Sequence, residues 1–206
     1  MEDHKEDHVS SEQRPALAES IYAALFAGLI TVGAYIAVPV PLSPVPIVLQ
    51  NFFVLLAGLL LRLRGAVASV ALYLALGAVG LPVFSAARGG VAHFAGPTGG
   101  YLAGFLPAVA VCALLSGGDT VGRGGAGRGR IARDAGAATA ATAVVYALGT
   151  PWLARVTDLP PGGAIAAGIL PFLPGDVLKI AAAVAVARIA RPLLHRRGDH
   201  GDGVPG

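Results

Sequence analysis

The chain has 206 residues, of which 55% are hydrophobic and only 13% are charged. Soluble domains carry about 25% charged residues, so about half of the expected charge is missing. This composition cannot give a soluble globule its polar surface, which argues against a soluble enzyme, a nucleic-acid-binding protein and a disordered protein. The single cysteine, Cys112, excludes an intramolecular disulfide and a cysteine-based zinc cluster. We therefore expect an integral membrane protein.

The chain begins with an acidic and polar stretch, MEDHKEDHVSSEQRP. A secretory signal peptide needs a basic start followed by an apolar core, and this stretch has neither. We expect residues 1–19 to form a disordered cytoplasmic tail and residues 20–194 to form one membrane domain. Residues 195–206 are expected to form a flexible cytoplasmic tail.

Six apolar segments are candidates for membrane-spanning helices, each of which needs about 20 predominantly apolar residues. They are residues 20–38, 47–61, 65–81, 98–115, 135–153 and 162–190. Four prolines in PVPLSPVP end the first segment. The sixth contains Pro171, Pro174 and Gly175, which predict a short re-entrant or interfacial piece followed by a helix over about 174–190. The runs lack the alternation of barrel strands, so the sequence predicts an all-α fold of six transmembrane helices.

The fifteen Lys and Arg residues predict the orientation of these helices. Twelve of them lie in the amino tail, the loop after the second segment, the glycine-rich loop after the fourth segment and the carboxyl end. Arg88 and Arg155 lie on the opposite side, and Lys179 lies within the sixth segment. Because positive loops stay in the cytoplasm, both termini are expected to be cytoplasmic. The loop over 81–97 is then expected to face outward.

Asp176 and Lys179 are the ionisable residues placed well inside an apolar segment. Such residues are costly in the bilayer and usually indicate function, and a spacing of three places both on one helix face. A structural role is the alternative, because a carboxylate complements the helix dipole in the first turn and Lys179 could pair with it. In the functional interpretation, Lys179 and Arg88 engage a substrate carboxylate while Asp176 accepts N–H groups from a polar ring.

Three further residues are candidate contributors to a substrate-binding site. Arg88 lies in the outward loop, where binding of lipid phosphate is an equal alternative. Gln50 is polar and begins the second segment beside Asn51, where hydrogen bonding between helices is the simpler interpretation. Tyr101 follows GPTGG and lies close to the expected pocket, although packing is the more ordinary role of such an aromatic residue.

Small residues four apart in the first segment allow another helix to approach closely. Ala23 and Ala27 form one such pair, and Ala24 and Gly28 form another. Either pair would serve internal packing or a partner subunit. The sequence contains no phosphate-binding loop and no metalloprotease or nucleophile-elbow motif, so a chain of this kind would need a partner to supply energy.

Four stretches in order give the chain a resemblance to a known family. They are PVPLSPVPIVLQNFFVLLAGLLL (39–61), LGAVGLPVF (76–84), GPTGGYLAGF (96–105) and LPFLPGDVLK (170–179). Together they resemble the biotin-transporter S components, the BioY family of energy-coupling factor (ECF) importers. The family often has Thr where this chain has Asn51, and its outer loop is variable around Arg88.

The resemblance implies the six-helix S-component bundle in the cell membrane, with biotin bound in an outward-facing pocket as a transported ligand and no cofactor. It also implies an ATPase pair and a transmembrane coupling protein as partners, with Ala23 and Ala27 at the coupling interface. Asp176 and Lys179 are the positions that it assigns to the ligand. The chain is then not an enzyme. Three rival functions remain open: an S component for another vitamin, a proton-coupled carrier of small acids, and a membrane-embedded enzyme.

Overall fold

The computed structural model describes residues 6–41, 43–117 and 128–195, and most of these residues are helical. The elements in chain order are α1 (Glu6–Tyr35), β1 (Ala37–Val38), β2 (Ile47–Val48), α2 (Gln50–Leu60), α3 (Leu63–Ala78), the 3-10 helices η1 (Ser85–Ala87) and η2 (Val91–Ala95), α4 (Gly99–Ser116), α5 (Arg128–Thr157), α6 (Pro161–Gly168) and α7 (Leu173–His195). Helices thus form at all six predicted segments, and the all-α class is confirmed.

Fewer than six of these helices are long enough to cross a membrane on their own. Three apolar stretches are: Leu17–Tyr35 in α1, Gly99–Ser116 in α4, and α5. The helices α6 and α7 are bent by 47° at the break between them, and together they are long and apolar enough to be a fourth, broken span or a re-entrant loop. Pro171 lies in this break and Pro174 lies in the first turn of α7, where the sequence predicted an interruption. The helices α2 and α3 are apolar but shorter, with 11 and 16 residues, so a count of six spans stays a prediction.

The structure differs from the expected boundaries in two places. The first helix begins at Glu6, so residues 6–19 are helical where a disordered tail was expected; residues 1–5 and the expected tail over 196–206 lie outside the described residues. Two short strands on either side of the proline-rich stretch also form an antiparallel hairpin, in which Ala37 pairs with Val48 and Val38 with Ile47. The hairpin satisfies backbone groups after α1 has ended, and strands this short leave no alternating pattern to detect.

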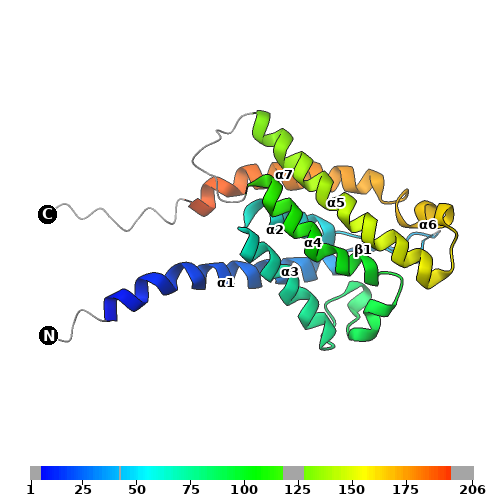
Figure 1. The fold of residues 1–206 in the computed structure, drawn as a ribbon, viewed down its shortest axis with the longest axis horizontal. Coiled ribbons are helices and arrows are strands. Elements are labelled where there is room, and N and C mark those ends of the chain that lie inside the picture. The colour runs from blue at the N-terminus through cyan, green and yellow to red at the C-terminus, as the bar shows by residue number, and fades with distance from the viewer. Residues whose placement is uncertain (1–5, 42, 118–127, 196–206) are drawn as a thin grey trace.

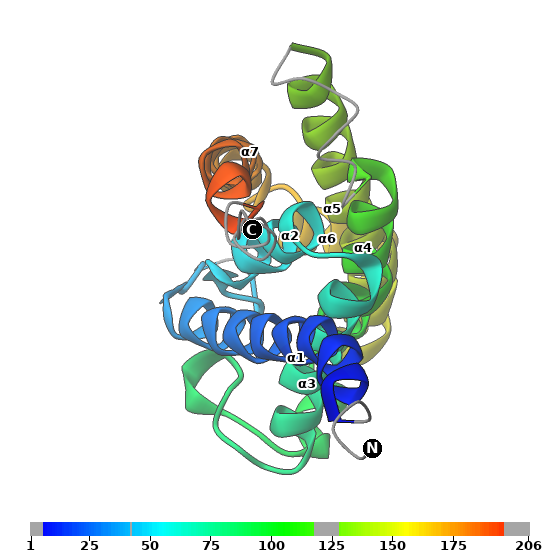
Figure 2. The same ribbon diagram turned by 90° about the vertical axis from the view of Figure 1, so that its left-hand side faces the viewer.

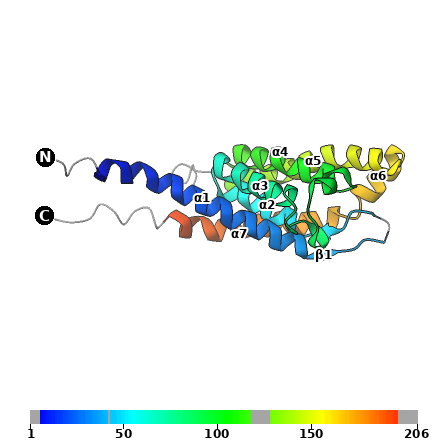
Figure 3. The same cartoon turned by 90° about the horizontal axis from the view of Figure 1, so that it is seen from below.

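The helices run between two distinct ends of the bundle (Figures 1 and 3). The start of α1, the junction of α2 with α3, the start of α5 and the end of α7 gather at one end, which we call the arginine end. The arginines at this end include Arg62, Arg64, Arg128, Arg130, Arg133, Arg188 and Arg191. The β1–β2 hairpin, the loop over 79–98 and α6 lie at the other end, which we call the pocket end. Sequence segments with many and with few positive charges are therefore at opposite ends.

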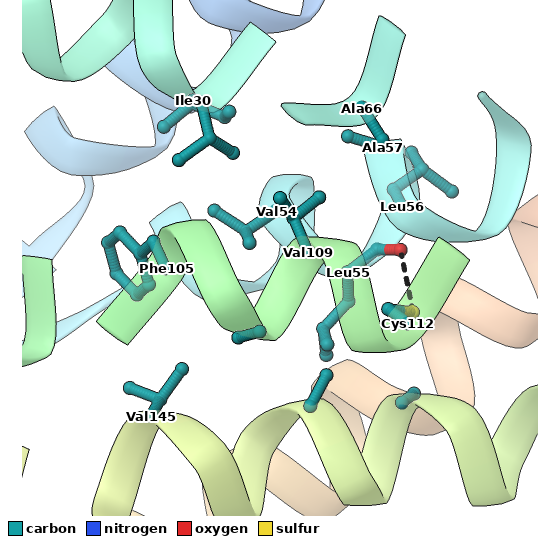
Figure 4. Packing of buried hydrophobic residues seen from close by; sticks show 14 of the residues in the cluster. Ile30, Val54, Leu55, Leu56, Ala57, Ala66, Phe105, Val109, Cys112 and Val145 are labelled. Atoms are coloured by element: carbon teal, nitrogen blue, oxygen red, sulfur yellow. Dashed lines mark hydrogen bonds between the residues drawn. The ribbon is translucent and has the colours of Figure 1, made fainter. Parts of the chain in front are cut away.

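The short helix α2 occupies the centre of the bundle, as seen in Figure 2, which looks along the long axis of the molecule. It contacts α1, α3, α4, α5 and α7, and its residues from Val54 to Leu59 are all buried. Side chains from α1, α4 and α5, including Ile30, Phe105 and Val145, complete the apolar core around it (Figure 4). The apolar character of α2 on every side is thus explained by burial in protein.

Three polar side chains from two other helices, α4 and α7, bind backbone carbonyls along α2. Cys112 Sγ lies 3.7 Å from Leu55 O, Ser116 Oγ donates to Gly58 O at 3.1 Å and Arg191 Nη2 donates to Leu59 O at 2.7 Å. The last carbonyls of a helix have no partner within the helix. These side chains supply partners for two of them inside the protein.

Arg191 also forms a buried ion pair with Asp134 that the sequence analysis did not anticipate. Arg191 Nη1 lies 2.5 Å from Asp134 Oδ2 and Arg191 Nη2 lies 3.2 Å from Asp134 Oδ1. Asp134 is fully buried and Arg191 is 6% exposed. The pair therefore joins α5 and α7 to the end of α2 by a two-pronged contact, which is the strong geometry for Arg and a carboxylate.

Candidate binding site

The pocket end contains a cavity between the ends of α2, α4, α5 and α7 and the two outer loops. The volume of this cavity is about 50 Å³. Ligand pockets commonly have about 300–1,000 Å³. A ligand of ordinary size therefore requires the wall segments to separate. Residues of the hairpin (Val45, Pro46 and Val48) and of the loop over 79–98 (Ser85, His93 and Thr98) form the part of the wall outside long helices.

The polar centre of the site consists of Tyr146, Asp176 and Lys179. Lys179 Nζ donates to Asp176 Oδ1 at 3.1 Å, and the Tyr146 hydroxyl donates to Asp176 Oδ2. Asp176 is 4% exposed and Lys179 is 8% exposed. The bend before α7 positions this group, because Asp176 and Lys179 lie in the first turns of that helix while Tyr146 comes from the facing helix α5. Asp176 and Lys179 lie on one helix face as predicted, and they pair with each other, which was the structural alternative.

Two other polar wall residues are held by buried hydrogen bonds. Gln50 Nε2, at the start of α2, donates to the Tyr73 hydroxyl at 2.8 Å. The Tyr101 hydroxyl donates to Gly168 O at 3.0 Å, which ties α4 to the end of α6. A Cβ atom at Gly149 would lie 2.3 Å from the Tyr101 ring, so the absence of a side chain there lets the ring pack against α5. Gln50 and Tyr101 therefore line the cavity with their side chains held by hydrogen bonds.

The rest of the helical wall is mostly apolar. Leu102 and Phe105 on α4 contribute to it, together with the half-buried Asn51 on α2, and Phe172 adds an apolar side chain from the break between α6 and α7. The cavity thus combines an apolar surface with a compact group of hydrogen-bonding and charged side chains, which is the usual chemistry of a small-molecule site.

The loop over 79–98 is organised around the buried ring of Phe84. His93 stacks on this ring with the centroids 5.0 Å apart, and Tyr73 and Phe94 meet it edge-on. His93 Nε2 lies 3.2 Å from Thr98 Oγ1. Burial, together with the positive charge of Arg88, lowers the pKa of His93 below its ordinary value. The imidazole therefore faces the cavity in its neutral form at neutral pH.

The structure brings most of the predicted binding residues together, but not all of them. Gln50, Tyr101 and Lys179 line the cavity, and Asp176 lies directly behind Lys179. Arg88 does not line it: its side chain is exposed, and its backbone pairs with Phe84. The charge of Arg88 nevertheless acts on the cavity through His93.

The two pairs of small residues in α1 face different surroundings. Ala23 and Ala27, the predicted partner interface, are 6% and 2% exposed and pack within the chain itself. Ala24 and Gly28 are exposed, and a Cβ atom at Gly28 would meet no atom within 4 Å. In this conformation the second pair is the one open to a neighbour.

Sequence reasoning missed Tyr146. Its hydroxyl bonds a residue 30 positions away, and α3, α4 and α5 each carry one tyrosine, so its sequence position gave no reason to prefer it. Among residues 6–41, 43–117 and 128–195, no group of three or more His, Cys, Asp or Glu side chains is arranged to hold a metal ion.

A helical membrane bundle with a buried charged pair at the edge of a mostly apolar pocket defines a membrane protein that binds a small molecule. A solved structure has this fold: "the S-component for biotin from an ECF-type ABC transporter" superposes with a TM-score of 0.77 at 28% identity, covering 87% of this chain and 93% of that one. The fold is therefore that of an ECF S component.

A sequence model of the BioY family matches residues 5–196, and the chain belongs to this family. The probable biotin transporter BioY of Pyrococcus horikoshii is 40% identical over 164 residues, which cover 80% of this chain and 90% of that protein. The biotin transporter BioY of Thermotoga maritima is 37% identical over 172 residues, covering 83% and 94%. The resemblance found in the sequence is confirmed. Together with the apolar helices, it identifies a multi-pass integral protein of the cell membrane.

Proposed function

We propose that this chain captures biotin at the outer face of the cell membrane for import. The observation that carries the proposal is the buried group of Tyr146, Asp176 and Lys179 at the edge of a mostly apolar cavity, in a chain whose relatives are biotin transporters. Those relatives are named as transporters, and the proposed role is accordingly binding and delivery without chemical change of the ligand.

The chemistry of biotin suits this site. Its ureido ring offers two N–H donors and a carbonyl acceptor, and its thiolane ring and aliphatic chain are apolar. Asp176 and Lys179 bear opposite charges and neutralise each other at 3.1 Å, so the group they form with Tyr146 suits the uncharged ureido ring. Phe105, Phe172 and their apolar neighbours suit the rest of the ligand.

The valerate carboxylate then extends toward the loop over 79–98. Arg88 lies in this loop, and its positive charge already acts on His93 in the cavity wall. We assign Arg88 to the carboxylate through this charge. The hairpin and the outer loop separate to admit the ligand and close over it.

The proposal includes a partner module that powers release into the cell, consisting of a transmembrane coupling protein and an ATPase pair. Two observations support it: the likeness to an S component of an ECF-type transporter, and a sequence that contains no phosphate-binding loop of its own. The exposed face of α1 that contains Ala24 and Gly28 is the proposed contact with the coupling protein.

Equilibrium binding of labelled biotin to the purified full chain in detergent tests the proposed ligand. The native chain should bind tightly, and Lys179→Met should bind at least about tenfold more weakly, a loss of about 1.4 kcal/mol. Arg188→Met is the matched control, because Arg188 is an exposed cation farther along the same helix. Thiamin and riboflavin should fail to compete.

Each other outcome has a definite meaning. Failure of the folded native chain to bind biotin would overturn the proposal. Competition by thiamin or riboflavin would indicate an S component for another vitamin. Equal binding by Lys179→Met and the native chain would keep biotin as the ligand but give Lys179 a structural role.

A further inference from the structure

Three arginines and one aspartate lie close together where α5 begins and α7 ends. Asp134 gives both carboxylate oxygens to Arg191, at 2.5 Å from Nη1 and 3.2 Å from Nη2. Arg130 and Arg133 lie four positions and one position before Asp134 on α5. The charges of all three neighbours act on Arg130. The single negative charge of this group is therefore held by Arg191, and two positive charges in the group are left over.

Arg130 is the member of this group whose donors are unpaired. Positions four apart are neighbours on a helix, so Asp134 would be the natural partner of Arg130, but Arg191 occupies its carboxylate. Arg130 Nε and Nη2 are shielded from solvent, and neither finds an acceptor among the residues that the structure describes. Shielded donors of a charged group are costly to leave unpaired. Arg130 is thus suited to an acceptor from outside the described part of the chain.

Arg133 adds a second guanidinium group beside Arg130. Its Nη2 donates to Ser116 O, at the end of α4, at 2.5 Å. The side chain of Arg133 is exposed, and a guanidinium group has five N–H donors, so it can bind a further acceptor. A spacing of three places Arg130 and Arg133 on the same side of α5. Such a pair suits the oxygens of a phosphate group, which arginine binds through two parallel hydrogen bonds.

The length of α5 places these arginines at the depth of lipid headgroups. The helix has 30 residues and is about 45 Å long at about 1.5 Å per residue. A bilayer with its headgroup regions is about 40–45 Å thick, so the first turn of α5 lies among the headgroups when the helix crosses the membrane. Leu114 and Leu115 near the end of α4, and Ile189 near the end of α7, are exposed apolar side chains that suit acyl chains.

We propose that Arg130 and Arg133 bind the phosphate group of an anionic phospholipid in the leaflet at the arginine end, with the side chain of Arg130 turned outward to meet it. Basic pockets between transmembrane helices bind such headgroups. A zwitterionic headgroup carries its own positive charge beside the phosphate, whereas an anionic headgroup offsets one of the two left-over charges. This site lies at the opposite end of the bundle from the cavity and goes beyond the proposed function, because it requires no biotin.

Native mass spectrometry of the full chain in detergent, titrated with dioleoyl phosphatidylglycerol, measures the affinity for the lipid. The native chain should retain a tightly bound lipid molecule. Arg130→Met should bind it at least about fivefold more weakly, which is the effect of one cation near a headgroup. Arg130→Lys keeps the charge but not the two-pronged geometry, so its affinity should lie between the two. Arg64→Met is the matched control, because Arg64 is an exposed arginine of the same end on α3, and it should keep the native affinity.

Two other probes distinguish a lipid from a free phosphate ion. Dioleoyl phosphatidylcholine has the same chains and a phosphate group but no net charge, and it should bind at least about fivefold more weakly than phosphatidylglycerol. Inorganic phosphate has the charge without the chains and should not displace phosphatidylglycerol. Displacement by inorganic phosphate would indicate a site for free anions and overturn the assignment to a lipid.

Two further results would contradict the inference. Equal losses of affinity in Arg130→Met and Arg64→Met would indicate attraction by the overall positive charge of the arginine end and overturn a specific site. A folded native chain that retains no phosphatidylglycerol would also overturn it, and would leave these arginines to an acidic segment of a partner protein.

The unfolding temperature in lipid-free detergent establishes that the variants are folded. Arg130→Met removes a positive charge that acts on Arg191, so it should unfold at a temperature no lower than that of the native chain. Biotin binding is measured on the same preparations and should be unchanged in Arg130→Met. The lipid site and the proposed function can therefore fail independently of each other.

Discussion

His93 is the residue at which pH should act on the pocket end. Burial and Arg88 lower the pKa of this imidazole, so the unfolded chain takes up the proton more readily than the folded chain. The neutral form thus contributes stability that is fully present above the unfolded value of about 6.5. This contribution is lost as the pH falls through the lower, folded-state pKa.

We expect the unfolding temperature of the native chain to decrease as the pH falls from 7 toward 5 (about the range over which histidine titrates). His93→Gln cannot take up a proton and should decrease less over the same range. Arg88→Gln should lie between them, because it removes the second of the two causes of the lowered pKa. Thermal unfolding of the three proteins across pH in one detergent makes the comparison. Parallel curves for all three would contradict the assignment to His93.

Single residues were predictable where charge singled them out. Asp176 and Lys179 could be chosen because ionisable groups inside an apolar run are rare, and the structure places them in contact. Tyr146 could not be chosen, because its role depends on the packing of α5 against α7. Arg88 was predicted from its charge alone, and its side chain turns out to be exposed outside the cavity wall.

At the scale of elements, the apolar runs identified every α-helix but not the contacts between helix ends. Asp134 and Arg191 lie where α5 begins and α7 ends, next to charges that serve as orientation signals. Nothing in the sequence distinguishes their pairing from the solvated charges around them. The hairpin of β1 and β2 was equally undetectable, since each strand has two residues.

The Asp134–Arg191 pair should contribute strongly to the stability of the arginine end. Arg191→Met leaves a fully buried carboxylate without its ion-pair partner, and removing one member of a buried pair typically costs about 3–5 kcal/mol. We expect a marked loss of unfolding free energy, measured by denaturant titration in mixed micelles. Arg188→Met, on the exposed face of the same helix, should have little effect.

The double variant Asp134→Leu/Arg191→Met provides the second comparison. Replacing both charges removes the unpaired carboxylate but leaves Leu59 O without its donor. Its stability should therefore lie between those of the native chain and Arg191→Met. A double variant less stable than Arg191→Met would show that the ion pair is not the main contribution.

At the scale of the whole molecule, the two ends of the bundle predict how the protein sits in the membrane. The arginine end should face the cytoplasm, because positively charged segments are retained there. Cysteine labelling can test this, since the native Cys112 is fully buried. Val91→Cys introduces an exposed thiol at the pocket end, and Gly129→Cys introduces one at the arginine end, where a Cβ atom meets open space.

A membrane-impermeant maleimide should label Val91→Cys in intact cells. The same reagent should label Gly129→Cys only after the membrane has been disrupted. The native chain is the control for labelling of Cys112. The reverse pattern would place the pocket end inside the cell and contradict capture of the ligand from outside.

The shortness of α2 has a consequence for the depth of the pocket. Eleven residues at about 1.5 Å each give a length of about 16 Å, and the hydrocarbon core is about 30 Å thick. Arg62 and Arg64 follow α2 directly, at the end that is expected to face the cytoplasm, whereas Gln50 and Asn51, at its start, line the cavity. If biotin rests on these residues, as proposed, binding alone brings it about halfway across the hydrocarbon core. The proposed partner module then has to move the ligand across the other half only.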